Sequence, residues 1–374
     1  LCLGKWKRNF GGTMLRSTIT TAVIALAIGM TTVASDAQVK IGFMATMSGP
    51  AGGLGQDMYD GFLLGIEHSG GKLGGQAVEV VKEDDQLKPD LATQIVQKLI
   101  QRDRVSIIAG ITFSNVLLAV LKPVTEKGVF LIGTNAGPAP AAGAACSPFF
   151  FSTSFQNDND PEGMGKYTTE QGLKRVILMA PNYQAGKDSL SGFKRFFKGE
   201  IIDEVYTQIN QPDYSAEIAQ IQFKRPDAVF VFYPGGMGIN FIKQYRQAGL
   251  MGQIPLFSHS TVDGATLPAL GDVALGAITV HHWGPDFDNP QSRKFVEAFE
   301  KKYNRVPSKY AAQSYDGALL LDSALRKVNG DLSDKTAFMA ALKQAEFNSV
   351  RGTFEFNNNN FPIQDYYLFE VEKD

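Results

Sequence analysis

A hydroxyl group where a predicted strand meets a predicted helix is the first feature of the sequence that could bind a ligand. The run Thr112-Phe113-Ser114-Asn115 follows an apolar stretch and begins a helical one. One interpretation is structural, because a serine at such a place caps a helix. The other is chemical, because a hydroxyl and the free backbone N–H groups of a helix start suit a carboxylate. The sequence alone leaves both interpretations open.

Other reactive side chains lack the spacing that catalysis or metal binding requires. Asp84-Asp85 could form an acid/base pair, but such a pair at a strand end more often caps and salt-bridges a neighbouring helix. No GxSxG motif indicates a serine hydrolase. We therefore predict a protein that is not an enzyme and that binds no metal. The four histidines, which show no HExxH spacing, are His68, His259, His281 and His282.

The glycine-rich loop at residues 49–55 invites comparison with nucleotide-binding loops. It departs from the GxGxxG pattern, because Met58 stands where the third glycine would be. A Walker A sequence is also missing. The loop is better explained as a tight turn between a strand and a helix. We therefore predict no nucleotide and no other cofactor.

The elements that must position these loops alternate along the chain. Strands that are apolar on both faces, each followed by a helix, predict parallel sheets covered on both sides. The pattern occurs twice without a linker, which predicts two similar α/β lobes. Ligands of such sheets bind beyond the carboxyl ends of the strands. The predicted strands are 39–44, 78–81, 105–110, 129–133, 175–180, 227–233, 254–257, 277–280, 353–356 and 366–371, and the loops at the site are 48–55, 112–115, 134–137 and 181–186.

Length and composition fit two lobes of a secreted protein. The chain has 374 residues, of which 44% are hydrophobic, and its formal net charge of -2 argues against a nucleic-acid partner. The N-terminal region predicts a cleaved signal peptide rather than a membrane anchor. It consists of Arg16, an apolar stretch at 17–30 and small residues up to Ala37. Met14 stands where such a leader normally begins, so residues 1–13 could precede the true start.

Cleavage after Ala37 would remove four of the 36 Lys and Arg residues and one of the 38 Asp and Glu residues, leaving a net charge of about -5. Of the two cysteines, Cys146 would remain in the mature chain, and none lies at the cleavage site. We therefore expect a free periplasmic protein of a Gram-negative bacterium rather than a lipoprotein.

The mature chain resembles the leucine/isoleucine/valine-binding type of periplasmic solute receptor over nearly all of residues 38–374. The resemblance implies an α/β protein of the type I periplasmic binding fold, with two doubly wound parallel-sheet lobes joined by a three-crossing hinge. Lobe one would comprise 38–156 and 284–349, and lobe two 157–283 and 350–374. The order and spacing of these motifs carry the resemblance: Ile41-Gly42, Ser48-Gly49-Pro50, Gly55, Asp84-Asp85, Pro89, Gly110, Ser114, 128–132, 246–250 and Val350-Arg351-Gly352.

The resemblance also implies where the ligand binds. In such receptors a hydroxyl after the third strand and the loop after the fourth strand hold the ligand carboxylate, and here these are Ser114, Asn135 and Gly137. The first loop usually supplies an aromatic side chain, whereas Leu54 stands at the matching place. In lobe two, Ala185 replaces the expected tyrosine. Further residues that we place in the site are Phe113, Tyr183 as a substitute aromatic, Tyr233 as a second aromatic, His259 and Ser260.

The loop after residues 255–257 departs from the amino-acid receptors of the family. Those place an acid there for the ligand ammonium, but this chain reads Ser258-His259-Ser260, with Asp263 only later. A buried ammonium without a counter-charge would be costly. The predicted ligand is therefore an aromatic carboxylate without an α-amino group, such as a benzoate or cinnamate derivative. The stretches 155–158 and 182–188 also look like the receptors for aromatic acids.

We therefore predict the periplasmic substrate-binding component of an ABC importer, which closes by a hinge motion on a small organic acid. Its partners would be that acid and an inner-membrane permease, and we expect a monomer that binds no nucleic acid. Two alternatives remain on the same fold. One is a receptor for branched-chain or other amino acids, and the other is a ligand sensor.

Overall fold

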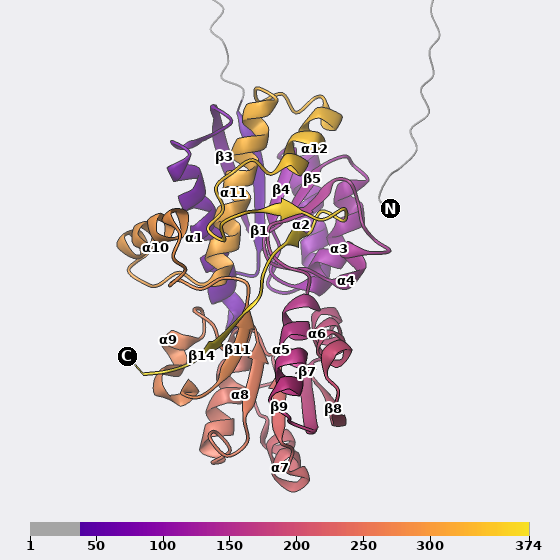
Figure 1. The fold of residues 1–374 in the computed structure, drawn as a ribbon. Coiled ribbons are helices and arrows are strands. Elements are labelled where there is room, and N and C mark those ends of the chain that lie inside the picture. Colours follow the sequence, from indigo (N-terminus) through magenta and orange to yellow (C-terminus); the bar gives the residue numbers. More distant parts are fainter. Residues whose placement is uncertain (1–37, 374) are drawn as a thin grey trace, which may run out of the picture.

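The computed structural model describes residues 38–373, so the predicted signal peptide at 1–37 lies outside the described part. Two α/β lobes are stacked one above the other, each built on a six-stranded sheet (Figure 1). Within the described residues, no helix combines the length and the apolar character needed to cross a membrane. The two sheets and their covering helices agree with the predicted fold class.

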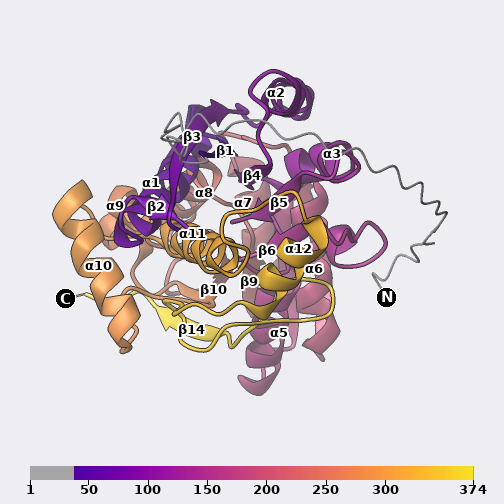
Figure 2. The ribbon, with the colours of Figure 1, turned by 90° about the horizontal axis from the view of Figure 1, so that it is seen from above.

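The sheet of lobe one has the order β2-β3-β1-β4-β5-β6, and all its pairs are parallel except the hairpin of β2 with β3. Helices α2 and α3 cover one face, and α1, α11 and α12 cover the other (Figure 2). Because both faces are covered, β4 and β5 are buried along their whole length. The strands are β1 (Val39–Ala45), β2 (Lys72–Leu73), β3 (Gln76–Asp84), β4 (Ile107–Gly110), β5 (Phe130–Gly133) and β6 (Phe150–Ser152), and the helices are η1 (Gly49–Ala51), α1 (Gly52–His68), α2 (Pro89–Gln101), α3 (Ser114–Thr125), α4 (Ala139–Ala142), α10 (Pro290–Tyr303), α11 (Lys309–Lys327) and α12 (Lys335–Gln344).

The sheet of lobe two has the order β14-β11-β10-β9-β7-β8, and only β14 is antiparallel to its neighbour. Its central strands β9 and β10 are completely buried, like those of lobe one. The strands are β7 (Arg175–Pro181), β8 (Glu200–Thr207), β9 (Ala228–Val231), β10 (Leu256–His259), β11 (Ile278–His281) and β14 (Tyr367–Glu370), and the helices are α5 (Asn159–Glu170), α6 (Gln184–Phe196), α7 (Ser215–Lys224), α8 (Gly236–Gln247), α9 (Leu267–Leu270) and η2 (Gly271–Ala274).

The chain passes between the lobes three times. The first passage joins β6 to α5, the second joins β11 to α10, and the third leads to β14. Before that third passage, the small sheet of β12 (Glu355–Phe356) and β13 (Pro362–Ile363) packs on lobe one. There the Phe356 ring contacts Phe151, and the Ser152 N–H donates to the Asn360 carbonyl at 2.9 Å. The third passage therefore comes later in the chain than the boundary at residue 350 that the sequence suggested.

Arg351 ties two of these passages together. Its Nη2 forms a buried ion pair with Asp316 Oδ2 at 2.9 Å. The same guanidinium donates to the carbonyls of Thr153 (2.7 Å) and Ser154 (3.1 Å) in the first passage. It also donates to Gln364 Oε1 (2.7 Å) in the third passage. Charge-assisted bonds from one planar group thus hold both segments in a fixed arrangement.

Candidate ligand-binding site

A cavity lies between the lobes at the carboxyl ends of the strands. In both sheets the strand order reverses beside the first strand of the lobe, β1 or β7, and ligands of open α/β sheets bind at such points. The empty space, including the part that is open to solvent, amounts to about 330 Å³. Its lining comes from loops of both lobes and from α11: Leu54, Thr112, Phe113, Ser114, Asn135, Ala136, Phe155, Asn157, Tyr183, Ala185, Phe232, Pro234, Ser260 and Tyr310.

Six of the nine site residues named from the sequence line this cavity, namely Leu54, Phe113, Ser114, Asn135, Tyr183 and Ser260. Asn135 also shapes the loop around it, because its amide donates to the Thr112 carbonyl (2.6 Å) and accepts from Gln313 (2.7 Å). The amide of Asn135 is therefore already hydrogen-bonded on both its nitrogen and its oxygen within the protein. The other three residues, Gly137, Tyr233 and His259, lie outside the lining.

Each of these three has a physical reason to lie elsewhere. Tyr233 packs among Tyr214 and Phe241, with ring centroids 5.0 and 5.2 Å away. Successive side chains of an extended chain point in opposite directions, so Phe232 faces the cavity instead. A Cβ on Gly137 would lie 1.8 Å from the Phe155 carbonyl oxygen, so this glycine permits two loops to touch.

His259 stands behind the lining rather than in it. Its ring lies 5.3 Å from that of Phe232 and 5.4 Å from that of Phe155, and both of those rings face the cavity. Its Nε2 lies 2.9 Å from Asp160 Oδ2, and both side chains are buried. Burial lowers the pKa of His259, against the opposing effect of the Asp160 charge. His259 therefore supports two aromatic walls.

Several lining residues were not predicted as part of the site. Phe155 and Asn157 follow β6, a strand that the sequence did not reveal, although the stretch 155–158 was the signal that could have identified them. Tyr310 comes from α11, far from any loop after a strand. Three further members of the lining lie in loops predicted at the site but were not named as site residues: Thr112, Ala136 and Ala185. Phe232 and Pro234 lie outside the predicted loops.

Aromatic rings form much of the lining. The Tyr183 ring lies 6.2 Å from Phe113 of lobe one and 6.2 Å from Phe232 of lobe two, stacked on the latter. Phe155 contributes a further ring. Aromatic side chains interact best with other planar groups in stacked or edge-to-face arrangements. The cavity therefore suits a flat ligand.

Ser114 is the first residue of α3, and the N-cap position before it belongs to Phe113. Ser114 therefore does not occupy the cap position that the structural interpretation gave it. Instead, Asn157 Nδ2 donates to Ser114 Oγ at 3.0 Å and to Asp188 Oδ2 at 3.0 Å. The Ser114 oxygen thus accepts a hydrogen bond, while the proton of the same hydroxyl has no acceptor among the described residues. This proton is available to a ligand.

Asp188 sits behind Asn157 and is held by further donors. The Ala139 N–H donates to Asp188 Oδ2 at 2.9 Å, and Gln184 Nε2 donates to Oδ1 at 2.7 Å. Burial raises the pKa of Asp188, and these bonds oppose the rise. This carboxylate does not line the cavity. Its contact joins the first residue of α4 in lobe one to α6 in lobe two.

The backbone before Ser114 is strained. Ile111 has a φ of 68°, which is unusual for a β-branched residue. Two hydrogen bonds hold it: its N–H donates to the Met44 carbonyl (2.7 Å), and its own carbonyl accepts from Ala136 N–H (3.0 Å). A conformation of this kind costs about 1–3 kcal/mol and is concentrated at functional sites. The strain directs the chain of residues 112–114 along the cavity.

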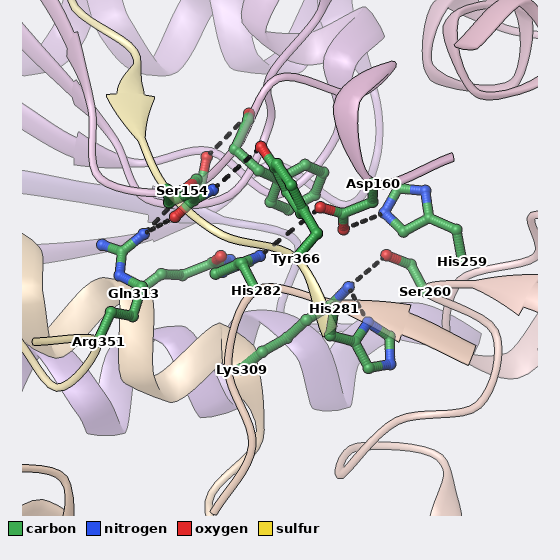
Figure 3. A network of polar contacts seen from close by, with 12 residues as sticks. Ser154, Asp160, His259, Ser260, His281, His282, Lys309, Gln313, Arg351 and Tyr366 are labelled. Carbon is green, nitrogen blue, oxygen red and sulfur yellow. Dashed lines mark hydrogen bonds and ion pairs between the residues drawn. The ribbon is translucent and has the colours of Figure 1, made fainter. Parts of the chain in front are cut away.

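Ser260, in lobe two, is held by a buried lysine (Figure 3). Lys309 Nζ donates to Ser260 Oγ at 2.6 Å and lies 3.0 Å from His281 Nδ1. His281 Nε2 lies 3.0 Å from the Val262 carbonyl, which can only accept, so Nδ1 is the acceptor for Lys309. Burial lowers the pKa of Lys309 and lowers that of His281 well below its usual value. Lobe one thus inserts a cation beside the cavity wall of lobe two.

The lining contains no acidic side chain among the described residues. Asp263, the acid that follows the β10 loop, is buried but lies outside the lining. Its Oδ1 accepts a bond from the Ala265 N–H at 3.0 Å. An ammonium group in the cavity would therefore lack a direct carboxylate partner.

Comparisons with known proteins place the chain in a family. A family model described as periplasmic binding protein matches residues 38–374. An ABC transporter solute-binding protein from R. palustris in complex with benzoate is 34% identical, with a TM-score of 0.87 over 90% of this chain and 93% of that one. A solute-binding protein of an ABC transporter from Rhodopseudomonas palustris BisB5, in complex with 3,4-dihydroxy benzoic acid, is 30% identical, with a TM-score of 0.85 over 90% and 94%.

A curated relative extends the comparison. The Leu/Ile/Val-binding protein homolog 6 of Brucella melitensis is 29% identical over 346 residues, which cover 90% of this chain and 88% of that protein. The matched region spans both lobes and all three passages between them. The chain belongs to the periplasmic binding protein family, as a solute-binding protein of the ABC-transporter kind.

Proposed function

We propose that this protein binds an aromatic carboxylate in the interlobe cavity and delivers it to the permease of an ABC importer. The observation that carries the proposal is the composition of the lining. It combines aromatic rings from both lobes with the Ser114 hydroxyl at a helix start, and it has no acidic side chain. Such a site has a donor for a carboxylate, a surface for a ring and no partner for an ammonium.

The carboxylate binds at the Ser114 end. Two kinds of donor meet at this end of the cavity. They are the free proton of Ser114 and the first N–H groups of α3, which have no partner within the helix. The positive end of the helix dipole adds to their effect on an anion. Tyr183, Phe232 and Phe155 enclose the ring of the ligand, so binding draws the two lobes together.

The relatives support this ligand class. Two of the solute-binding proteins named above were crystallised with benzoate and with 3,4-dihydroxy benzoic acid. Both share 30% or more of their residues with this chain over both lobes. The lining supports a benzoate-type acid independently of these relatives, because it combines aromatic rings and the Ser114 donor with the absence of an acidic side chain.

A thermal-shift and calorimetry screen of the mature chain tests the proposal. Benzoate, 4-hydroxybenzoate, coumarate and leucine are compared at equal concentrations. A ligand at about 100 times its dissociation constant stabilises the folded state by about 2.7 kcal/mol. We expect at least one aromatic acid to raise the melting temperature and leucine to leave it unchanged. Tight leucine binding without any response to the aromatic acids would contradict the proposal.

A receptor for branched-chain amino acids is the second candidate. The name of the Brucella melitensis relative favours it, and so does Asp263, a buried acid just outside the lining. The side chain of Tyr310, which lines the cavity, interacts with Asp263, so an ammonium would have to compete with this phenol for the acid. If leucine binds, Asp263→Asn should abolish its binding, whereas the binding of an aromatic acid should change little.

A further inference from the structure

Asp188 of α6, in lobe two, accepts hydrogen bonds from two donors of the loops beside lobe one. Its Oδ2 accepts from the Ala139 N–H at 2.9 Å and from Asn157 Nδ2 at 3.0 Å. Helices α4 and α6 lie next to each other where the two lobes meet (Figure 1). The Asp188 side chain is buried there. One carboxylate oxygen therefore joins the two lobes beside the cavity.

Asn157 is held to lobe one by its own backbone. Its N–H donates to the Gly137 carbonyl at 2.8 Å, in the loop that follows β5. The next residue is held to lobe two, because Asp158 Oδ2 pairs with Arg195 Nη2 of α6 at 2.6 Å. The first passage therefore changes lobes between residues 157 and 158. The bond from Asn157 to Asp188 spans this boundary through side chains.

Asp188 determines which atom of the Asn157 amide faces Ser114. Gln184 Nε2 donates to Asp188 Oδ1 at 2.7 Å, so both carboxylate oxygens accept bonds from N–H groups. A carboxylate can face the nitrogen of an amide but not its oxygen, because an ionised carboxylate only accepts. The Asn157 nitrogen therefore lies between Asp188 and Ser114, and it donates to Ser114 Oγ at 3.0 Å.

The opposite orientation of this amide would change the chemistry of the cavity. If Asn157 turned by 180°, its oxygen would face Ser114 and could accept the hydroxyl proton. That proton would then be used within the protein instead of being available to a ligand. An acceptor at position 188 excludes this orientation, because the two oxygens would be brought together.

We infer that Asp188 is a positioning residue through which lobe two keeps the Ser114 hydroxyl of lobe one available as a donor to the ligand carboxylate. It acts through Asn157 and does not itself line the cavity. Its negative charge opposes an anionic ligand nearby, so Asp188 favours binding by orienting a donor and not by attraction. This inference rests on the proposed function, because it takes the carboxylate to be bound at Ser114.

Two variants of equal charge and similar shape test the inference. Asp188→Asn and Asp188→Leu both remove the charge, but only asparagine keeps an oxygen that can accept from Ala139 and Asn157. Gln184 can turn its own amide to accept from the new NH₂ group, so asparagine leaves no donor unpaired. In calorimetry with benzoate and with 4-hydroxybenzoate, we expect Asp188→Leu to bind about threefold to tenfold more weakly than Asp188→Asn.

The same two variants in a Ser114→Ala background separate positioning from a structural role. Without the Ser114 hydroxyl, the direction of the Asn157 amide has nothing to act on. The affinities of the two double variants should therefore agree within about twofold, because the effect of Asp188 passes through Ser114. Asp272, whose side chain is 79% exposed, is the control. Asp272→Asn and Asp272→Leu should both bind like the wild type.

Melting temperatures show which variants are folded. If Asp188→Leu does not fold, Asp188→Ala replaces it, since water can then reach the freed N–H groups. Equal affinities of Asp188→Asn and the folded apolar variant would overturn the inference, and so would a difference that persists in the Ser114→Ala background. In both cases the proposed function stands. A wild-type protein that binds none of benzoate, 4-hydroxybenzoate and coumarate would contradict the proposed function, and the inference with it.

Discussion

Ser114 of lobe one and Ser260 of lobe two line the same cavity, and each accepts a hydrogen bond from a side-chain nitrogen. The donor is the neutral amide of Asn157 in the first case and the ammonium of Lys309 in the second. Behind the amide lies the carboxylate of Asp188, whereas histidines surround the lysine. Ser114 keeps its own proton available for a ligand, whereas the Ser260 hydroxyl also interacts with the Tyr310 phenol, which in turn interacts with Asp263. The two lobes thus present one serine with a free donor and one serine that is bonded within a polar network.

The largest expected effect comes from the histidines on the Ser260 side. Burial lowers the pKa of His259, His281 and His282, so in the folded protein they remain neutral below their usual pKa of 6.5. The unfolded chain then binds more protons than the folded one, and stability falls as the pH falls through 6.5. Each histidine should remove about 1.4 kcal/mol per pH unit from the free energy of unfolding, until its lowered pKa is reached.

Urea unfolding of the ligand-free protein at pH 7.5, 6.5 and 5.5 measures this slope. His282→Asn should reduce the slope by about one third, since three similar groups carry it. His68→Asn, at a partly buried histidine, should reduce it less. The Ser114 side contributes with the opposite sign, because burial raises the pKa of Asp188, so this group lowers stability as the pH rises. A stability that is the same at all three pH values would show that the histidines are not held neutral.

Ser114→Ala comes next in size. Loss of a bond to a charged carboxylate should weaken binding by about 1.5–3 kcal/mol, or roughly 10- to 150-fold. The loss should be equal for benzoate and 4-hydroxybenzoate, because both carry the same carboxylate. Calorimetry with both acids makes the comparison, and Ser191→Ala, at an exposed serine of α6, is the control. Unchanged affinity would mean that the carboxylate binds elsewhere.

Asn157→Ala should have a smaller effect of the same kind. Ser114 keeps its hydroxyl but loses the donor that orients it, so we expect benzoate to bind about threefold to tenfold more weakly. Asn358→Ala removes an exposed amide and should leave the affinity unchanged. If Asn157→Ala weakens benzoate binding more than Ser114→Ala does, the amide itself contacts the ligand.

Tyr233→Phe should have the smallest effect. The ring of Tyr233 packs in the core of lobe two, and its hydroxyl contacts Thr207 at 3.3 Å. We expect the affinity for an aromatic acid to change by less than about 0.5 kcal/mol, as is usual for changes away from a site. A tenfold loss in calorimetry would place Tyr233 at the ligand after all.

The sequence predicted the fold well because buried strands have a clear signature. Strands such as β4, β5 and β9 are short apolar runs that are buried along their whole length. The edge strand β8 was missed because three acidic residues interrupt its sequence and most of its residues are only half-buried. Short strands such as β6 carry too few residues to show a period.

Individual site residues were harder to predict, for reasons of geometry. At Phe232 and Tyr233 a difference of one position decides which ring faces the cavity, and composition cannot distinguish them. Lys309 gave no signal at all, since a lysine at the start of a helix is ordinarily exposed. Its role becomes visible only when α11 and the β10 loop, which are distant in sequence, are seen in contact.

Arg351 has a consequence for the route of the ligand. One guanidinium holds the first and third passages together, so neither can bend without the other unless buried charge-assisted bonds break. We expect the lobes to turn about one axis that runs beside this arginine. The gap between them then widens on the opposite side of the molecule, and a solute enters and departs there.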